Sequence, residues 1–150
     1  MKIKLLFATL LFVFAAIPVA ASETDYLARM AMESEIKCIA VVANVKKMSC
    51  NADGTFTRVT FKRVHAVSSF TPKKFVGACK VMDYRWQKRR PGTVYFKPRK
   101  GQKVYVTITT NGGAITSYTL LTPQLEAVIK KAPERLAYSK GRASILPHDE

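Results

Sequence analysis

The spacing of apolar positions changes along the chain, and each change marks a different predicted element. Four apolar or small positions in residues 23–37 recur at the spacing of one helical face: Leu27, Met30, Ala31 and Ser34. Residues 36–48 are instead apolar on both faces, a pattern typical of a strand that is covered on both sides. The sequence therefore predicts a short amphipathic helix followed by a buried strand.

A two-residue alternation begins after the turn signal NADG. Within residues 55–67, Val59 and Phe61 alternate with polar side chains, which predicts a strand with one buried face. The alternation slips by one position near Arg63 and Val64. Such a slip indicates a β-bulge, in which one strand carries an extra residue.

Strand-like runs continue through the middle of the chain, separated by turn residues. Four further strands are predicted: 75–86, 93–97, 103–110 and 114–121. The run NGG joins the last two. Asn and Gly tolerate positive φ, so this run predicts a tight hairpin.

A second helix is predicted after the last of these strands. Thr122 is a favourable N-cap, and Pro123 suits the first helical position because its missing N–H has no partner there anyway. The buried stripe of this helix would be apolar: Leu125, Val128 and Ile129. We expect the helix to end at Pro133 and residues 138–150 to form a loose C-terminal tail.

Five or six short strands with flanking helices predict a mainly β fold, a small closed or partly open antiparallel barrel of the OB-like type. The length suits one domain, residues 22–137. Five side chains are assigned to the barrel interior: Val59, Phe61, Val104, Val106 and Ile108. Val128 and Ile129 would lie on the helix face that covers the barrel.

The strand pattern resembles that of exported OB-like barrels, especially netrin-like domains (those like tissue inhibitors of metalloproteases). The stretches that carry the resemblance are IKCIAVVANVKKM, FTRVTFKRVHAV, KGQKVYVTITTNGGAITSYT and TPQLEAVIK, which cover most of residues 36–131. The resemblance implies a fold and not a function. The Cys-x-Cys with which the inhibitors engage the protease metal has no counterpart here, so protease inhibition is not implied.

The N-terminus has the pattern of an export signal. Lys2 and Lys4 precede an apolar run, residues 5–17, which is shorter than the ~20 residues needed to span a bilayer. Small residues at the cleavage positions predict a signal peptide, residues 1–21, cut after Ala21. The protein would then be secreted or periplasmic, and the competing interpretation is an uncleaved membrane anchor.

Three cysteines in an exported chain allow one disulfide. A strand between Cys38 and Cys50 would hold them far beyond the roughly 7 Å that a disulfide allows between Cα atoms. We therefore expect Cys79 to be oxidised, with Cys38 or alternatively with Cys50.

The sequence offers no recognisable catalytic constellation. His65 and His148 are the two histidines, and neither stands in a metal-binding spacing. A thiol nucleophile beside His65 is conceivable, but disulfide formation is the commoner fate of exported cysteines. We therefore predict a non-enzymatic protein without cofactor or metal.

The formal net charge of +15 favours acidic partners. Cations and aromatic residues concentrate in residues 84–103, which we predict to form one continuous ligand-binding face: Tyr84, Arg85, Trp86, Lys88, Arg89, Arg90, Lys97, Arg99, Lys100 and Lys103. Trp86 or Tyr84 would lie against the ligand, and the cations would hold phosphate or carboxylate. The partner could be an envelope polymer, an anionic lipid, a nucleic acid or an acidic protein.

A plainer interpretation of the same stretch remains open. The basic residues could be the solvated face of an ordinary hairpin, with Tyr95 and Phe96 in the core. The protein would then be an accessory or structural envelope protein that contacts another protein, and its charge would only keep it soluble. The two interpretations differ in salt dependence, because binding to a polyanion weakens steeply as salt rises.

Overall fold

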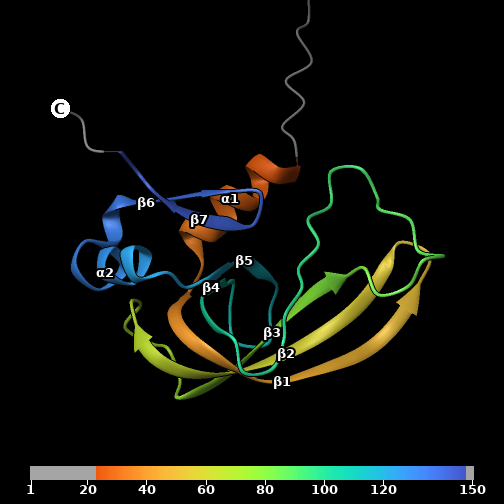
Figure 1. Ribbon diagram of the computed structural model, residues 1–150, viewed down its shortest axis with the longest axis horizontal. Coiled ribbons are helices and arrows are strands. Elements are labelled where there is room, and N and C mark those ends of the chain that lie inside the picture. The colour runs from red at the N-terminus through yellow and green to blue at the C-terminus, as the bar shows by residue number, and fades with distance from the viewer. Residues whose placement is uncertain (1–22, 148–150) are drawn as a thin grey trace, which may run out of the picture.

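The computed structural model describes residues 23–147, so the predicted signal peptide and its cleavage after Ala21 lie outside the described residues. Figure 1 shows a curled sheet with helices and a second hairpin on one side. The elements in chain order are α1 (Glu23–Glu33), β1 (Ile36–Asn51), β2 (Gly54–Ala66), β3 (Lys74–Val81), β4 (Lys103–Ile108), β5 (Ile115–Leu120), α2 (Pro123–Lys131), a 3₁₀ helix η1 (Pro133–Arg135), β6 (Leu136–Ser139) and β7 (Arg142–Ile145). Within residues 23–147, neither α-helix is long and apolar enough to cross a bilayer.

The large sheet has five strands in the order β3-β2-β1-β4-β5, and each neighbouring pair is antiparallel. Its free edge at β3 meets the β4–β5 turn, where Gly112 N donates to Val76 O (2.7 Å) and Ala78 N donates to Gly113 O (2.9 Å). A parallel bridge between Ala78 and Ala114 completes this contact. A mainly β fold is therefore confirmed, and a partly open barrel describes it.

The core has two layers because β4 and residues 36–42 of β1 are buried or half-buried on both faces. The prediction for the apolar run 36–48 is therefore confirmed only for its first part; Asn44, Lys46 and Lys47 in its second part are exposed. The five predicted interior residues are all fully buried in the first layer: Val59, Phe61, Val104, Val106 and Ile108. On the opposite face, Ile39 and Tyr105 pack with the helix α2 and the β6–β7 hairpin. Of the predicted α2 stripe, Leu125 and Ile129 are buried, and Val128 packs against them partly exposed.

Two local predictions from single residues are also confirmed. Ile39 pairs with His65 and the next residue of β1 pairs with Arg63, which leaves Val64 as the extra residue of a β-bulge. Thr122 caps α2, because its Oγ1 accepts a hydrogen bond from Leu125 N at 3.2 Å.

The predicted strand at 93–97 is wrong. Residues 93–99 form an irregular segment, here called the strap, and β3 ends at Val81 instead of residue 86. Pro91 and Pro98 flank the centre of this segment, and proline cannot donate a backbone hydrogen bond to a sheet. One strand-like bond remains, from Phe96 N to Lys80 O at 3.0 Å.

The predicted loose tail, residues 138–150, is also wrong over its described part. The strands β6 and β7 form a hairpin around Lys140 and Gly141, which both have positive φ, as a two-residue turn requires. Gly141 O accepts a hydrogen bond from Tyr118 N at 2.9 Å, which joins the hairpin to β5. Leu136 and Ala143 then complete the second core layer, so the tail is part of the fold.

The predicted disulfide is not formed, and all three cysteines, which lie within the described residues, are free. The reason is that β2 separates β1 from β3. Cys50 pairs with Thr55 on one side of β2 and Cys79 pairs with Thr57 on the other, so two strand spacings of ~4.8 Å separate them. Cys38 pairs with Ala66, at the far end of β2 from Thr57.

Candidate functional site: a cationic cleft and an aromatic tip

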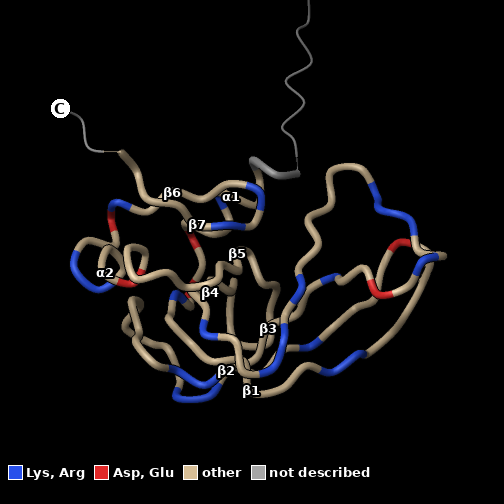
Figure 2. Tube along the Cα trace, in the orientation of Figure 1, with Lys and Arg blue, Asp and Glu red and all other residues tan. Residues whose placement is uncertain are grey.

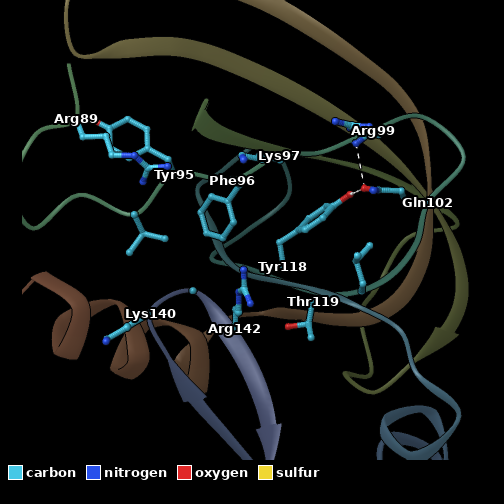
Figure 3. A pocket seen from close by; sticks show the side chains of 13 residues that line it. Arg89, Tyr95, Phe96, Lys97, Arg99, Gln102, Tyr118, Thr119, Lys140 and Arg142 are labelled. Atoms are coloured by element: carbon cyan, nitrogen blue, oxygen red, sulfur yellow. Dashed lines mark hydrogen bonds between the residues drawn. The ribbon is translucent and has the colours of Figure 1, made fainter. Parts of the chain in front are cut away.

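A cleft of about 610 Å³ opens between the strap, β5 and the β6–β7 turn (Figure 3). We call it the cationic cleft. Its lining includes five cations from three segments of the chain: Arg89, Lys97, Arg99, Lys140 and Arg142. Three aromatic side chains stand among them: Tyr95, Phe96 and Tyr118. A cleft lined by charge of one sign raises the local concentration of ions of the opposite sign, so this lining favours an anion.

The approach of the β6–β7 turn to the strap closes one wall of the cleft. Gly141 has a φ of +76°, and a Cβ at this position would lie 2.8 Å from Val94 Cγ1 and 2.9 Å from Phe96 Cε1. Glycine is therefore required here both for its backbone conformation and for the space it leaves. In Figure 3, Arg142 extends from β7 toward Phe96 and Tyr118.

A hydrogen-bonded pair fixes the opposite wall. The Tyr118 hydroxyl donates to Gln102 Oε1 at 2.5 Å, and the same oxygen accepts from Arg99 N at 3.1 Å. Burial raises the pKa of Tyr118 to about 12, so its hydroxyl stays neutral at ordinary pH. These contacts hold the strap end that carries Arg99.

The electrostatics of the cleft are one-sided. Among its described lining residues there is no Asp or Glu. Lys97, Arg99, Lys140 and Arg142 take part in no ion pair with any side chain that the structure describes, residues 26–147. The guanidinium of Arg89 lies 5.4 Å from the centre of the Tyr95 ring. Like charges on concave walls repel one another, and a bound anion would relieve that repulsion.

The first part of the predicted site lies elsewhere, on the far end of the β1–β2 hairpin. We call residues 82–92, together with this hairpin end, the tip, but count Arg89 with the cleft that it lines; in Figure 1 the tip lies at the right. The rings of Tyr84 and Trp86 are stacked, with centroids 6.0 Å apart, and both are about half exposed. Lys47 Nζ lies 5.1 Å from the Tyr84 ring centre and 3.4 Å from Asp83 Oδ2.

One buried side chain that sequence reasoning missed, Gln87, holds the tip loop in place. Its Oε1 accepts hydrogen bonds from the backbone N–H groups of Asp83 (2.9 Å) and Tyr84 (3.1 Å). Its Nε2 donates to Asn51 O (3.1 Å) and Thr55 Oγ1 (3.0 Å). The only feature of the sequence that marks Gln87 is that it is an uncharged residue within a run of cations. Its role could not be predicted, because it depends on contacts with the β1–β2 turn, which is distant in sequence.

Asp53 binds two further cations to the tip. Its Oδ2 lies 3.1 Å from Lys80 Nζ and 3.9 Å from Arg90 Nη1, and the hydrogen bond from Lys80 is the main reason that its pKa is lowered. The hydroxyl of Tyr95 donates to Asp53 O (2.6 Å) and accepts from Arg90 N (2.9 Å). Arg90 is therefore attached to the tip.

The residues predicted to form one face thus lie in separate places. The cleft receives Arg89, Lys97 and Arg99. Five other residues of the predicted face lie at the tip: Tyr84, Arg85, Trp86, Lys88 and Arg90. Lys100 is exposed in the next turn, and Lys103 Nζ pairs with Glu126 Oε1 of α2 at 3.3 Å. Lys140 and Arg142 were missed because their segment was expected to be loose.

Figure 2 shows the same division along the chain trace: acidic positions accompany the basic ones at the tip. Among the side chains that the structure describes, those of residues 26–147, no three His, Cys, Asp or Glu gather closely enough to hold a metal ion. Comparison of the chain with protein-family models, with curated protein sequences and with solved structures finds no match.

Proposed function

We propose that this protein is an exported, non-enzymatic binding module that holds an anionic partner in the cationic cleft. The observation that carries the proposal is the convergence of five cations on a concave surface whose described lining contains no carboxylate. They come from the tip loop, the strap and the β6–β7 hairpin. Export rests on the N-terminal sequence pattern alone.

The surroundings of the thiols support binding over thiol catalysis. Burial raises the pKa of Cys38 to about 11 and that of Cys79 to about 12. The thiolate is the nucleophilic form, so burial makes both groups poorer nucleophiles at neutral pH than a solvated thiol would be. Cys50 is exposed, and its sulfur accepts hydrogen bonds from Gln87 Nε2 (3.3 Å) and Thr55 Oγ1 (3.7 Å).

The chemistry of the cleft favours phosphate or carboxylate groups. Arg89, Arg99 and Arg142 each offer a planar fork of donors that matches two oxygens of such a group. Lys97 and Lys140 add point charges. Envelope polymers, anionic lipids, nucleic acids and acidic proteins all present these oxygens, so the proposal names an anionic partner.

Two charge-matched triple variants test the proposal. Arg89→Ser/Lys97→Ser/Arg142→Ser alters the cleft, and Arg85→Ser/Lys88→Ser/Arg90→Ser alters the tip; each removes two Arg and one Lys. Affinity for heparin and for single-stranded DNA is measured over a range of salt. Each phosphate contact contributes ~0.7–0.9 to the slope of log K against log salt for nucleic acids. We expect the cleft variant to bind more weakly with a flatter slope, and the tip variant to resemble the parent. Equal effects of the two variants would reject the cleft.

One observation favours a second candidate function, contact with another protein through the tip. Tyr84 and Trp86 present a rigid stacked pair of aromatic rings to solvent. Aromatic side chains of this kind are enriched in protein interfaces. A complex formed there would survive high salt and would be lost in a Trp86→Ser variant, whereas the cleft variant would retain it.

A further inference from the structure

A second hollow lies on the other side of the strap from the cationic cleft. This apolar groove, of about 410 Å³, runs between α1, β3 and the strap. Its walls include Leu27, Phe56, Ala78, Cys79 and Ile115. Among the described residues that line it, Lys80 alone carries a charge, and its ammonium group is engaged by Asp53. The groove therefore offers almost nothing to a polar ligand.

The cleft and the groove share two residues of the strap. Val94 and Phe96 line both hollows, and the remaining lining residues of each differ. On the cleft side, the Phe96 ring meets Tyr118 edge-on, with centroids 6.4 Å apart. Val94 and Phe96 thus separate five cations on one side of the strap from apolar side chains on the other, and Phe96 is itself only 8% exposed. A molecule that passes over the strap would have one end among the cations and the other end among the apolar side chains.

We propose that the ligand is an anionic amphiphile, with its acidic headgroup in the cationic cleft and its acyl chain in the apolar groove. This inference rests on the proposed function and narrows the class of partner. The groove volume falls in the range of small-molecule sites, ~300–1,000 Å³. Phe56 at its edge is 45% exposed and Tyr26 is 62% exposed, and an acyl chain would remove part of this surface from water.

An anionic amphiphile fits the two hollows better than two other occupants, a second copy of the chain and a wholly polar polyanion. A second copy of the chain would bring another strongly positive net charge toward a cationic cleft, and that approach is repulsive. A wholly polar polyanion satisfies the cleft but leaves the groove exposed. An amphiphile with an acidic head satisfies both hollows with one molecule.

Four small probes, used below their micelle-forming concentrations, separate head from chain. They are monododecyl phosphate, monooctyl phosphate, methyl phosphate and the uncharged dodecyl maltoside, each titrated into the purified protein by calorimetry. Each methylene that is fully buried strengthens binding about fourfold. We expect dodecyl phosphate to bind at least tenfold more tightly than octyl phosphate, and both to bind more tightly than methyl phosphate or the maltoside.

Matched variants then locate the two ends of the ligand. Ala114 is exposed and lines the groove, so Ala114→Phe should fill it; Thr110→Phe places the same ring on the same turn outside the groove. The first should remove the preference for the longer chain, and the second should keep it. Arg142→Ser should weaken dodecyl phosphate severalfold, and Lys131→Ser, an exposed cation of α2, should not.

The outcomes separate this inference from the proposed function. If methyl phosphate and dodecyl phosphate bind alike and both depend on Arg142, the cleft binds anions and the amphiphile is wrong. If chain length matters while Arg142→Ser and Lys131→Ser behave alike, the groove binds chains and the cationic cleft fails. If no phosphate probe binds at low salt, both proposals are overturned.

Discussion

The cationic cleft and the tip draw on the same basic stretch of sequence but hold their cations in different surroundings. At the tip, Asp53 and Asp83 pair with Lys80, Arg90 and Lys47, and the aromatic rings stack on each other. In the cleft, the cations line a concave wall that includes no described carboxylate. Charge density along the chain therefore does not distinguish the two regions; the proposal of an anion site rests on the hollow and on the absence of carboxylates from its described lining.

The largest change would destroy both regions together. Val106 is fully buried between β1 and β5, so Val106→Asp places an unpaired charge in the barrel. Such a burial costs several kcal/mol against a typical total stability of ~5–15 kcal/mol. We expect loss of the cooperative melting transition by circular dichroism. An unshifted melting curve would mean that the side chain at position 106 is not buried in the barrel.

Two glycine substitutions compare the wall of the cleft with an open turn, through the loss of stability that each one causes. Gly141 and Gly101 both have positive φ, but a Cβ at Gly101 meets nothing within 4 Å, whereas one at Gly141 strikes Val94 and Phe96. Gly101→Ala should cost about 1–2 kcal/mol of unfolding free energy from the backbone alone. Gly141→Ala should cost about 1–3 kcal/mol more, because the strap must move. Chemical denaturation measures both, and equal losses would show that the strap does not rest on this turn.

Removal of Gln87 should loosen the tip and spare the cleft. Gln87→Ala leaves the N–H groups of Asp83 and Tyr84 without their side-chain partner, a loss of about 1–3 kcal/mol. We expect the fluorescence of Trp86, the single Trp, to shift toward that of a solvated indole. Gln124→Ala, at an exposed position of α2, is the control. Unchanged stability and emission would mean that the loop is held by other contacts.

The smallest expected effect is a difference in thiol reactivity between the tip and the interior of the protein. Cys50 is exposed at the tip, while Cys79 is buried beside the groove and Cys38 is buried in the barrel. At pH 8, iodoacetamide should modify Cys50 in the folded protein and all three thiols after denaturation. Mass spectrometry counts the products. A protein that resists alkylation at Cys79 even when denatured without reductant would carry the disulfide that the structure lacks.

The two buried thiols, Cys38 and Cys79, determine the direction in which their own contribution to the stability of the fold changes with pH. In the unfolded chain their pKa is near 9.0, and burial raises it to about 11 for Cys38 and about 12 for Cys79. The unfolded state therefore releases protons first as pH rises. We expect their contribution to stability to be constant below pH 9 and to fall between pH 9 and 12. A Cys38→Ala/Cys79→Ala variant should lose this part of the decline.

The fold was predictable where the evidence is local. The period-two pattern that contains Val59 and Phe61, the bulge at Val64 and the cap at Thr122 each depend on residues close in sequence. The strap was not predictable, because Val94–Tyr95–Phe96 has strand-like composition and only tertiary packing shows that it lacks a partner strand.

The cleft was half predictable for the same reason. Arg89, Lys97 and Arg99 stand within one basic stretch, and their clustering was visible in sequence. Arg142 reaches them only because the Gly141 turn packs on Val94 and Phe96, a long-range contact. The disulfide of Cys79 was wrongly predicted because the alternation of apolar and polar residues within each strand does not reveal the order of the strands. In the sheet, β2 lies between β1 and β3.

The most direct test of the central claim is to map where a small anion binds. Amide and indole signals of the isotope-labelled protein are followed by NMR during titration with tripolyphosphate at low salt. The account predicts that the amide signals of Gln102, Gly141 and Arg142 around the cleft shift and saturate together, while the indole N–H of Trp86 at the tip stays in place. A saturating shift of the Trp86 indole without movement at Gly141, or no shift at either region, would contradict it.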